Sequence, residues 1–303
     1  MIKNICDIII ILFILCVLYI IIMNLLFCNE YFTEEKKKLA FCFLIYDEIN
    51  HEDLWYKFFK NIDKNKYNIY IHYKYQKKLK YFEEYKLDKC IDTKYADISL
   101  TKAQNILFRK AYEDIENYKF IMISNSCIPL KSFNYIYKQL INDNKGYLNE
   151  ANELNIPKNA KYLINYFDYD TIGYSHQWII LNRKLVNKLA FIDDNTLDLY
   201  FKDVFAPEEY YYYTYIKLLK LENELYITKN ISNDATTFTQ WNDVYYKYKD
   251  DNNKGLKNYN LISKEEMDYL LNSKSLFGRK FNIICNVIDN DKLININDYI
   301  NYD

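Results

Sequence analysis

From residue 39 onward, continuous apolar runs alternate with segments whose apolar residues recur at helical spacing. Residues 39–46 (LAFCFLIY) form one such run, as expected of a strand that is buried on both faces. Further strands are predicted over 67–73, 119–124 and 179–181, and helices over 52–62, from Thr101 onward, and over 131–141. This alternation predicts an α/β protein with a mostly parallel sheet flanked by helices.

In sheets of this kind, ligands bind outside the carboxyl ends of the parallel strands. His72 lies near the end of the second predicted strand, and Ser124 to Ser126 end the third. We therefore expect His72, Ser124 and Ser126 to lie at the edge of the sheet where a ligand binds. Thr101 and Gln104 have the spacing of a capping box, which predicts that the intervening helix begins at Thr101.

An apolar segment of 21 residues, 8–28, contains no charged side chain. As a helix it would span the roughly 30 Å hydrocarbon core of a bilayer. A cleaved signal peptide has a shorter apolar core and a small-residue cleavage site, and neither is found here. The sequence therefore predicts a tail over 1–7, an uncleaved anchor over 8–28, a stem over 29–38 and a globular domain over 39–303. The flanking lysines favour an outward amino end, but long domains translocate regardless of such charges, which leaves the orientation open.

The charge balance argues against nucleic-acid binding, because 40 Lys and Arg residues face 41 Asp and Glu residues. Cys42, Cys90, Cys127 and Cys285 of the domain lack zinc-ligand spacing, and Cys42 and Cys127 read as small buried side chains. Residues 230–232 form a glycosylation sequon that only a secretory lumen could use. Arg occurs three times in the chain, so each Arg is a candidate for bidentate oxyanion binding.

The scarce His, Trp, Arg and Pro residues gather in short motifs spread over the domain. Eight segments appear in this order: FCFLIYDEINHEDLW, YIHYK, AQNILFRKAYED, FIMISNSCIPL, HQWIILNRK, FAPEEYYYYT, TFTQW and LFGRKF. Together they resemble the core-2/I-branching β-1,6-N-acetylglucosaminyltransferase family, which includes xylosyltransferase relatives, from about residue 39 to about residue 281. The resemblance implies a GT-A-type fold, inversion at the anomeric carbon, a UDP-sugar donor, no cofactor or metal, and a single-pass type II Golgi membrane protein.

The resemblance also implies roles for individual residues. Glu209, the second acid of the P-E-E triplet, falls on the catalytic base, where relatives read P-D-E. Arg279 or Lys280 falls on the diphosphate-binding segment, with Lys280 the closer match, and Lys257 is a weak candidate for a second cation. Trp241 matches an aromatic residue that contacts the acceptor sugar. The supporting candidates are Glu208, His176, Gln177, Trp178 and Arg183.

Elementary chemistry supports these roles independently. Inverting transfer needs one positioned base, and the departing diphosphate needs a metal or fixed cations, for which Arg279 beside Lys280 is suited. Asp168 and Asp170 form a D-x-D triplet that could instead hold Mg²⁺ or Mn²⁺, but acidic triplets are common by chance. We therefore expect a membrane-anchored transferase that moves N-acetylglucosamine to a glycan or glycoprotein. The alternatives are a xylosyltransferase-like enzyme and an inactive, membrane-tethered glycan-binding protein.

Overall fold

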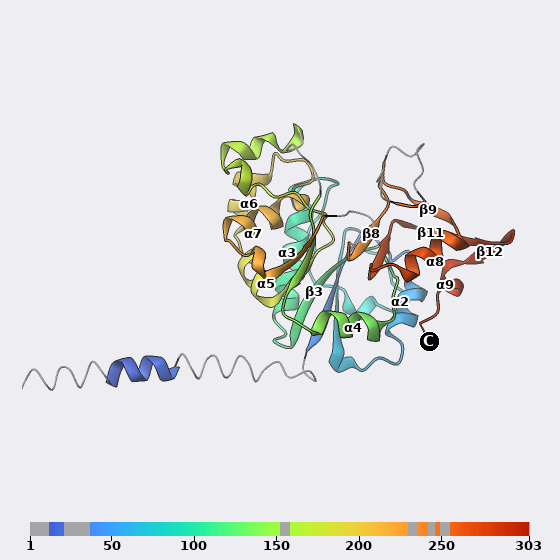
Figure 1. Ribbon diagram of the computed structural model, residues 1–303, viewed down its shortest axis with the longest axis horizontal. Coiled ribbons are helices and arrows are strands. Elements are labelled where there is room, and N and C mark those ends of the chain that lie inside the picture. The colour runs from blue at the N-terminus through green and yellow to red at the C-terminus, as the bar shows by residue number, and fades with distance from the viewer. Residues whose placement is uncertain are drawn as a thin grey trace, which may run out of the picture.

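The computed structural model describes residues 12–20, 37–151, 158–229, 235–241, 246–248 and 255–302. Its centre is a six-stranded sheet with the strand order β2-β1-β3-β6-β5-β7 (Figure 1). The strands are β1 (Lys38–Ile45), β2 (Tyr67–Tyr73), β3 (Asn117–Ser124), β5 (Gly146–Asn149), β6 (Ile180–Asn182) and β7 (Leu225–Thr228). Only β6 runs antiparallel to its neighbours among the described strands of this sheet. The predicted mostly parallel α/β sheet is therefore confirmed.

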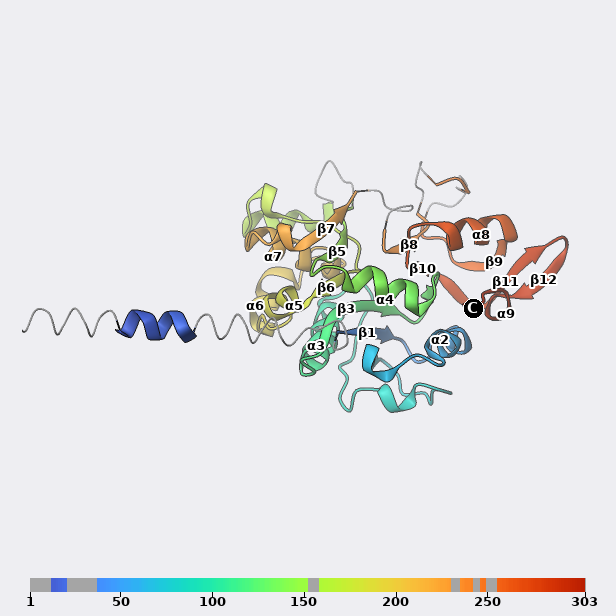
Figure 2. The same ribbon diagram turned by 60° about the horizontal axis from the view of Figure 1, so that its bottom comes forward.

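Helices cover both faces of this sheet, and α3 and α4 lie on opposite sides of β1 and β3 (Figure 2). One hydrophobic cluster joins one sheet face to α2 and α4, and another joins the other face to α3, α5, α6 and α7. The helices are α2 (Glu52–Phe59), α3 (Ile98–Tyr112), α4 (Phe133–Ile141), α5 (Arg183–Leu189), α6 (Asp194–Phe201), α7 (Tyr211–Leu218), α8 (Lys264–Asn272) and α9 (Ile296–Tyr299).

The apolar run of β1 is buried on both faces because successive side chains point to opposite sides of a strand. Phe41 and Phe43 pack against Trp55 of α2, with ring centroids 6.3 and 4.9 Å away. Cys42 faces the other cluster and is fully buried, and Cys127 is buried as well, so both thiols act as small core side chains as predicted. The Trp55 indole also donates a hydrogen bond of 3.0 Å to the carbonyl of Cys127, which fixes α2 near the carboxyl end of β3.

Three helix boundaries differ from the predictions. Helix α4 begins at Phe133 rather than at residue 131, because the extended residue Ser132 accepts a hydrogen bond from the Tyr135 amide and caps it. Helix α3 begins at Ile98, because the extended residue Asp97 accepts a hydrogen bond from the Ser99 amide and caps it. Thr101 and Gln104 are thus buried inside the helix, and the predicted capping box is wrong. Helix α2 ends at Phe59, before residue 62, because Lys60 turns to an extended conformation.

Two three-stranded sheets lie beside the carboxyl end of β3, toward the right of Figure 1. One contains β4 (Ile128–Pro129), β8 (Thr237–Thr239) and β10 (Phe277–Arg279). The other contains β9 (Tyr259–Ser263), β11 (Phe281–Asp289) and β12 (Lys292–Asn295). Strand β4 follows β3 directly and pairs with β10, so the late segments of the chain are held at the edge where the parallel strands end.

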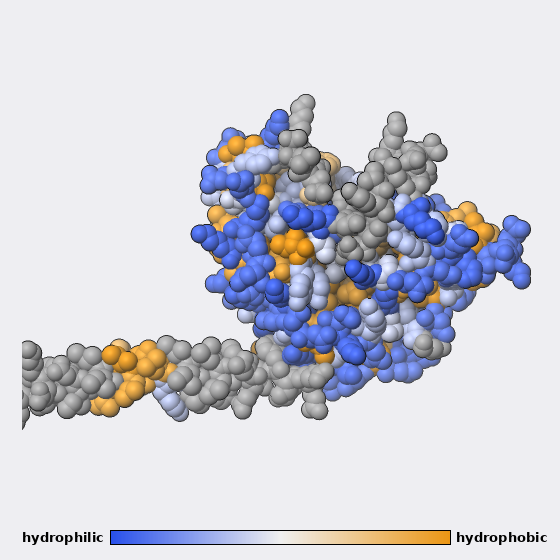
Figure 3. Space-filling model, in the orientation of Figure 1, coloured by the Kyte–Doolittle hydropathy of each residue, from blue (hydrophilic) through white to orange (hydrophobic). Residues whose placement is uncertain are grey.

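Of the predicted anchor over 8–28, the structure describes residues 12–20, which are helical and apolar (orange in Figure 3). The rest of that segment, the tail over 1–7 and residues 29–36 of the stem lie outside the described residues. Among the residues described, we find no helix with the length and hydropathy needed to cross a bilayer. The sequon over 230–232 also lies outside the described residues.

Candidate active site

The P-E-E triplet forms a short 3₁₀ turn, η6 (Pro207–Glu209), immediately before α7. Pro207 occupies the first position of this turn, where its fixed φ fits and its missing amide hydrogen costs nothing. The turn separates the two acids: Glu208 is only 6% exposed, whereas Glu209 is partly exposed. Glu209 is therefore the acid of this pair that is accessible to a substrate.

Glu208 lies in an apolar environment that disfavours its ionised form. Burial, reinforced by the neighbouring charges of Glu209 and Asp97, raises the pKa of Glu208 to about 8. Among the described residues, its Oε2 atom has no hydrogen-bond partner. Glu208 is thus held as the neutral acid at neutral pH.

A short segment before β6, residues 175–178, connects the turn of Glu209 to the cations of the site. The Ser175 amide donates a hydrogen bond of 2.8 Å to the carbonyl oxygen of Glu209. Three residues later, the indole of Trp178 lies under the guanidinium of Arg279, which is 4.0 Å from the ring centroid. Glu209 and Arg279, which are 70 positions apart in the sequence, are thereby brought to the same site.

His176 of the same segment lies beside the strand that pairs with β10. Its Nδ1 atom is 3.3 Å from Oγ1 of Thr239, and Thr239 is the register partner of Arg279. His176 therefore contributes to the placement of β8 next to Arg279. Gln177 lies between His176 and Trp178 and is partly exposed.

Arg279 and Lys280 follow one another at the end of β10. The next residue, Phe281, donates its amide to the carbonyl of Ser126 at 3.0 Å, which holds this segment against the end of β3. The Lys280 carbonyl accepts a hydrogen bond of 2.8 Å from the Tyr259 amide. The two cations are therefore fixed by backbone contacts on both sides.

The electrostatics of this pair favour an anion. Burial lowers the pKa of Arg279, and the charges of Cys127 and Glu209 act in the opposite direction. Burial and the adjacent Arg279 lower the pKa of Lys280. Within the described ranges, neither side chain forms an ion pair with a carboxylate. Two partly buried neighbouring cations without a carboxylate partner suit a ligand with two negative charges.

Trp241 lies just beyond β8 and is 42% exposed. The preceding residue, Gln240, is buried and accepts a short hydrogen bond of 2.5 Å from the Tyr259 hydroxyl. The Tyr259 hydroxyl oxygen also lies 2.9 Å from the buried carboxylate of Glu266, and Lys257 pairs with that carboxylate at 3.4 Å. The structure thus places Lys257 in a buried network that supports Trp241 and Lys280.

His72, Ser124 and Ser126 lie at the carboxyl ends of β2 and β3 as expected, but they are buried. Nε2 of His72 accepts a hydrogen bond of 3.1 Å from the Ile91 amide, and burial lowers its pKa to about 4. The hydroxyls of Ser124 and Ser126 are 3.2 Å apart. All three side chains are therefore packed inside the protein rather than exposed to a ligand.

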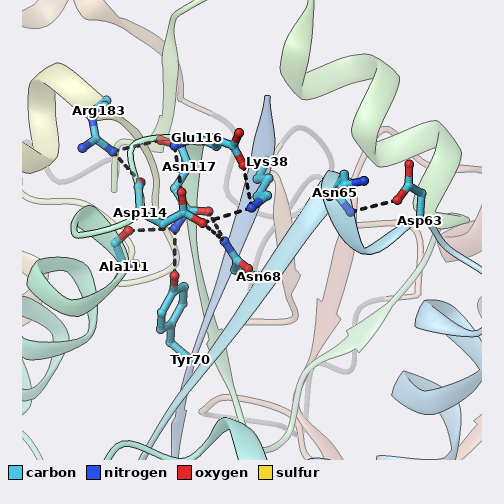
Figure 4. Close-up of polar contacts among 10 residues, drawn as sticks. All are labelled: Lys38, Asp63, Asn65, Asn68, Tyr70, Ala111, Asp114, Glu116, Asn117 and Arg183. Carbon is cyan, nitrogen blue, oxygen red and sulfur yellow. Dashed lines mark hydrogen bonds and ion pairs between the residues drawn. The ribbon is translucent and has the colours of Figure 1, made fainter. Parts of the chain in front are cut away.

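Arg183 lies at the amino end of β3 and is not brought to the site. Figure 4 shows it beside Asp114 and Asn117. Its guanidinium donates to the carbonyls of Tyr112, Asp114 and Asn117, at distances of 2.7, 2.9 and 3.3 Å. Asn117 begins β3, whereas the site lies where β3 ends. Arg183 therefore ties the end of α3 to the sheet, because a planar guanidinium can satisfy several carbonyls at once.

Asp168 and Asp170 lie on an exposed 3₁₀ turn, η5 (Tyr169–Thr171), with Asp168 at its start. In the part of the chain that the structure describes, no three His, Cys, Asp or Glu side chains gather in a way that could hold a metal ion.

Sequence reasoning missed Asn50 and Thr239. The Asn50 amide donates to the Asn125 carbonyl at 2.9 Å, and its side chain donates to the Phe281 carbonyl at 2.8 Å. Asn50 thereby clamps the cationic segment to the end of β3. Its position shortly after β1 was a usable signal, because the same strand-end rule identified Ser124.

The chain matches the family model for the Core-2/I-Branching enzyme over residues 39–270. Glycosyltransferase BC10 of Oryza sativa subsp. japonica is 20% identical to it over 154 residues, which cover 48% of this chain and 39% of that relative. The chain thus spans well under half the length of this curated relative. The family match over residues 39–270 includes Glu209, and it confirms the resemblance seen in the motifs. The chain belongs to the Core-2/I-branching enzyme family.

Proposed function

We propose that the protein is an inverting glycosyltransferase that moves N-acetylglucosamine from UDP-N-acetylglucosamine to a glycan hydroxyl. One observation carries the proposal: residues 175–178 contact the turn of Glu209 at one end and the Arg279 guanidinium at the other. An accessible carboxylate and a pair of neighbouring cations are the two elements that displacement of a nucleoside diphosphate requires.

In the proposed reaction, the acceptor oxygen attacks the anomeric carbon from the face opposite the diphosphate. The new carbon–oxygen bond forms as the bond to the β-phosphate oxygen breaks, and the configuration inverts. The acceptor proton passes to the Glu209 carboxylate, and the electron pair of the broken bond leaves with UDP. Arg279 and Lys280 stabilise the charge that develops on the diphosphate. Trp241 offers an aromatic face for the C–H face of the acceptor sugar.

We propose that the reaction needs no metal. Arg279 and Lys280 supply fixed positive charge where a divalent ion would otherwise act. The exposed position of Asp168 and Asp170 on η5 supports this division of roles.

We further propose that residues 8–28 anchor the protein in a Golgi or other secretory membrane with its carboxyl domain in the lumen. The length and the uncharged character of this segment support the proposal. A lumenal domain would also make the sequon at Asn230 usable.

A panel of UDP-sugars, each with and without a glycan library, tests the proposed reaction on the full chain in mild detergent. We expect release of UDP from UDP-N-acetylglucosamine and a product of inverted configuration. Glu209→Gln keeps the shape of the side chain but removes the base, so turnover should fall by about 10²-fold or more while UDP binding persists. Glu208→Gln is the matched control and should remain active.

Three outcomes would contradict the proposal in different ways. Preference for UDP-xylose would assign the xylosyltransferase-like alternative. Glycan binding without release of UDP from any donor would assign the inactive, glycan-binding alternative. Normal turnover of Glu209→Gln together with an inactive Glu208→Gln would exchange the roles of the two acids.

A further inference from the structure

Two exposed aromatic side chains lie beside each other next to the P-E-E turn. Tyr95, in the loop before α3, is 91% exposed, and no other large apolar or aromatic side chain in the described ranges is as exposed. Phe205, two residues before Pro207, is 52% exposed. Their ring centroids are 6.2 Å apart, and the ring planes meet at 76°. Such exposure contributes almost nothing to the core, so folding does not explain why rings occupy both positions.

The backbone holds the two rings in place. Each ring is followed by an alanine with φ of 54°, Ala96 after Tyr95 and Ala206 after Phe205. A left-handed conformation is unfavourable for alanine and persists only where surrounding contacts hold it. Here the Ala206 amide donates a hydrogen bond of 3.1 Å to the Ala96 carbonyl, which ties the two loops together. The rings are therefore displayed by two mutually fixed turns.

The pair also borders the candidate active site. Phe205 is four residues before Glu209 on the same loop. The Glu209 amide donates a hydrogen bond of 3.0 Å to the carbonyl of Ala206, and the amide of Ala206 holds the loop of Tyr95. The charge of Asp97, two residues after Tyr95, contributes to the raised pKa of Glu208. The two rings thus stand at the rim of the site that contains both the base and the cations.

We propose that Tyr95 and Phe205 form a stacking subsite for a sugar of the acceptor glycan, beyond the sugar that receives the transferred residue. This inference rests on the proposed function. An acceptor whose hydroxyl meets Glu209 must lie across the loop of Glu209, and Phe205 belongs to that loop. Aromatic faces bind the C–H face of a pyranose, and two rings at a steep angle offer one face and one edge to the same sugar. The acceptor is therefore an oligosaccharide rather than a single sugar.

The inference is tested by binding of the full chain, with UDP present, to an array of glycans from one to four sugars long. Tyr95→Ala and Phe205→Ala should each weaken binding to glycans of two or more sugars by about tenfold, which corresponds to about 1.4 kcal/mol of lost stacking. Tyr95→Phe keeps the ring and should bind as the unmodified protein does. Tyr135→Ala on α4, where the ring is also exposed, is the matched control and should leave binding unchanged.

Calorimetric titration with UDP separates the possible occupants of the subsite. Both alanine variants should bind UDP normally, and weakened UDP binding would instead place the uracil ring on this pair and overturn the inference. Unchanged glycan binding by both variants would also overturn it. Release of UDP from UDP-N-acetylglucosamine is measured separately on the same samples. If the alanine variants lose glycan binding and the unmodified protein releases no UDP from any donor, the proposed transfer is refuted but the subsite is retained.

Discussion

Replacing Glu208 with Gln should stabilise the folded protein at neutral pH and have a much smaller effect in acid. The Glu208 side chain is 6% exposed, its Oε2 atom has no hydrogen-bond partner among the described residues, and burial raises its pKa to about 8. In the unfolded chain the same carboxyl ionises near its ordinary pKa of 4.5. Gln has a similar shape and is neutral at every pH, so it removes only this difference between the two states.

The magnitude follows from proton linkage. Below about pH 4.5, Glu208 is protonated in both states, and its contribution to stability does not change with pH. Between about pH 4.5 and 8 the unfolded state loses the proton that the folded state keeps, so stability falls by about 1.4 kcal/mol per pH unit. From about pH 5 to 7.5 the wild-type protein therefore loses about 3 kcal/mol that Glu208→Gln retains.

Urea unfolding of the full chain in mild detergent, at about pH 5 and about pH 7.5, measures this difference. The free energy of unfolding of Glu208→Gln minus that of the wild type should increase by about 3 kcal/mol between the two conditions. Glu84→Gln, an exposed substitution on η3 (Glu83–Tyr85), controls for general effects of charge. A difference that is the same at both pH values would refute the buried, neutral state of Glu208.

The remaining predictions concern the cations, the metal and the anchor. Lys280→Ala should lower kcat/KM for the UDP-sugar in steady-state assays, by an amount that corresponds to a loss of about 2–4 kcal/mol of transition-state stabilisation. An unchanged kcat/KM would show that Lys280 does not act on the donor. Activity should persist in excess EDTA, whereas loss that Mn²⁺ restores would assign metal ligation to Asp168 and Asp170. Mass spectrometry of the mature protein should find residues 8–28 retained and Asn230 glycosylated, and an amino terminus after residue 28 would contradict the anchor.

The central strands could be predicted because their signal is local. The apolar run over 39–46 and the alternating run over 67–73 become β1 and β2 almost without change, since a buried strand must be apolar in sequence. The start of α3 was misplaced because two capping signals compete there. Asp97 caps the helix one turn earlier, and the pair of Thr101 and Gln104 carries the same sequence pattern without performing that function.

The site was less predictable because its geometry is non-local. The sequence identified Glu209, Arg279 and Lys280, but it did not show that residues 175–178 contact both groups. Arg183 looked equivalent to Arg279 as a scarce cation, yet its three carbonyl partners lie near the start of β3. Arg183 follows β6, which runs antiparallel to β3 and so ends near the start of β3, whereas Arg279 lies on β10 of another sheet. No local pattern encodes either placement.

The position of β10 in the chain has a consequence for synthesis on the ribosome. The last strand of the six-stranded sheet ends at residue 228, whereas the cationic strand begins only at Phe277. A nascent chain can therefore complete its central sheet, with Glu209 already present, about fifty residues before Arg279 and Lys280 are translated. A chain that ends prematurely between these points would keep the central sheet and the base but lack the cations proposed to bind the donor.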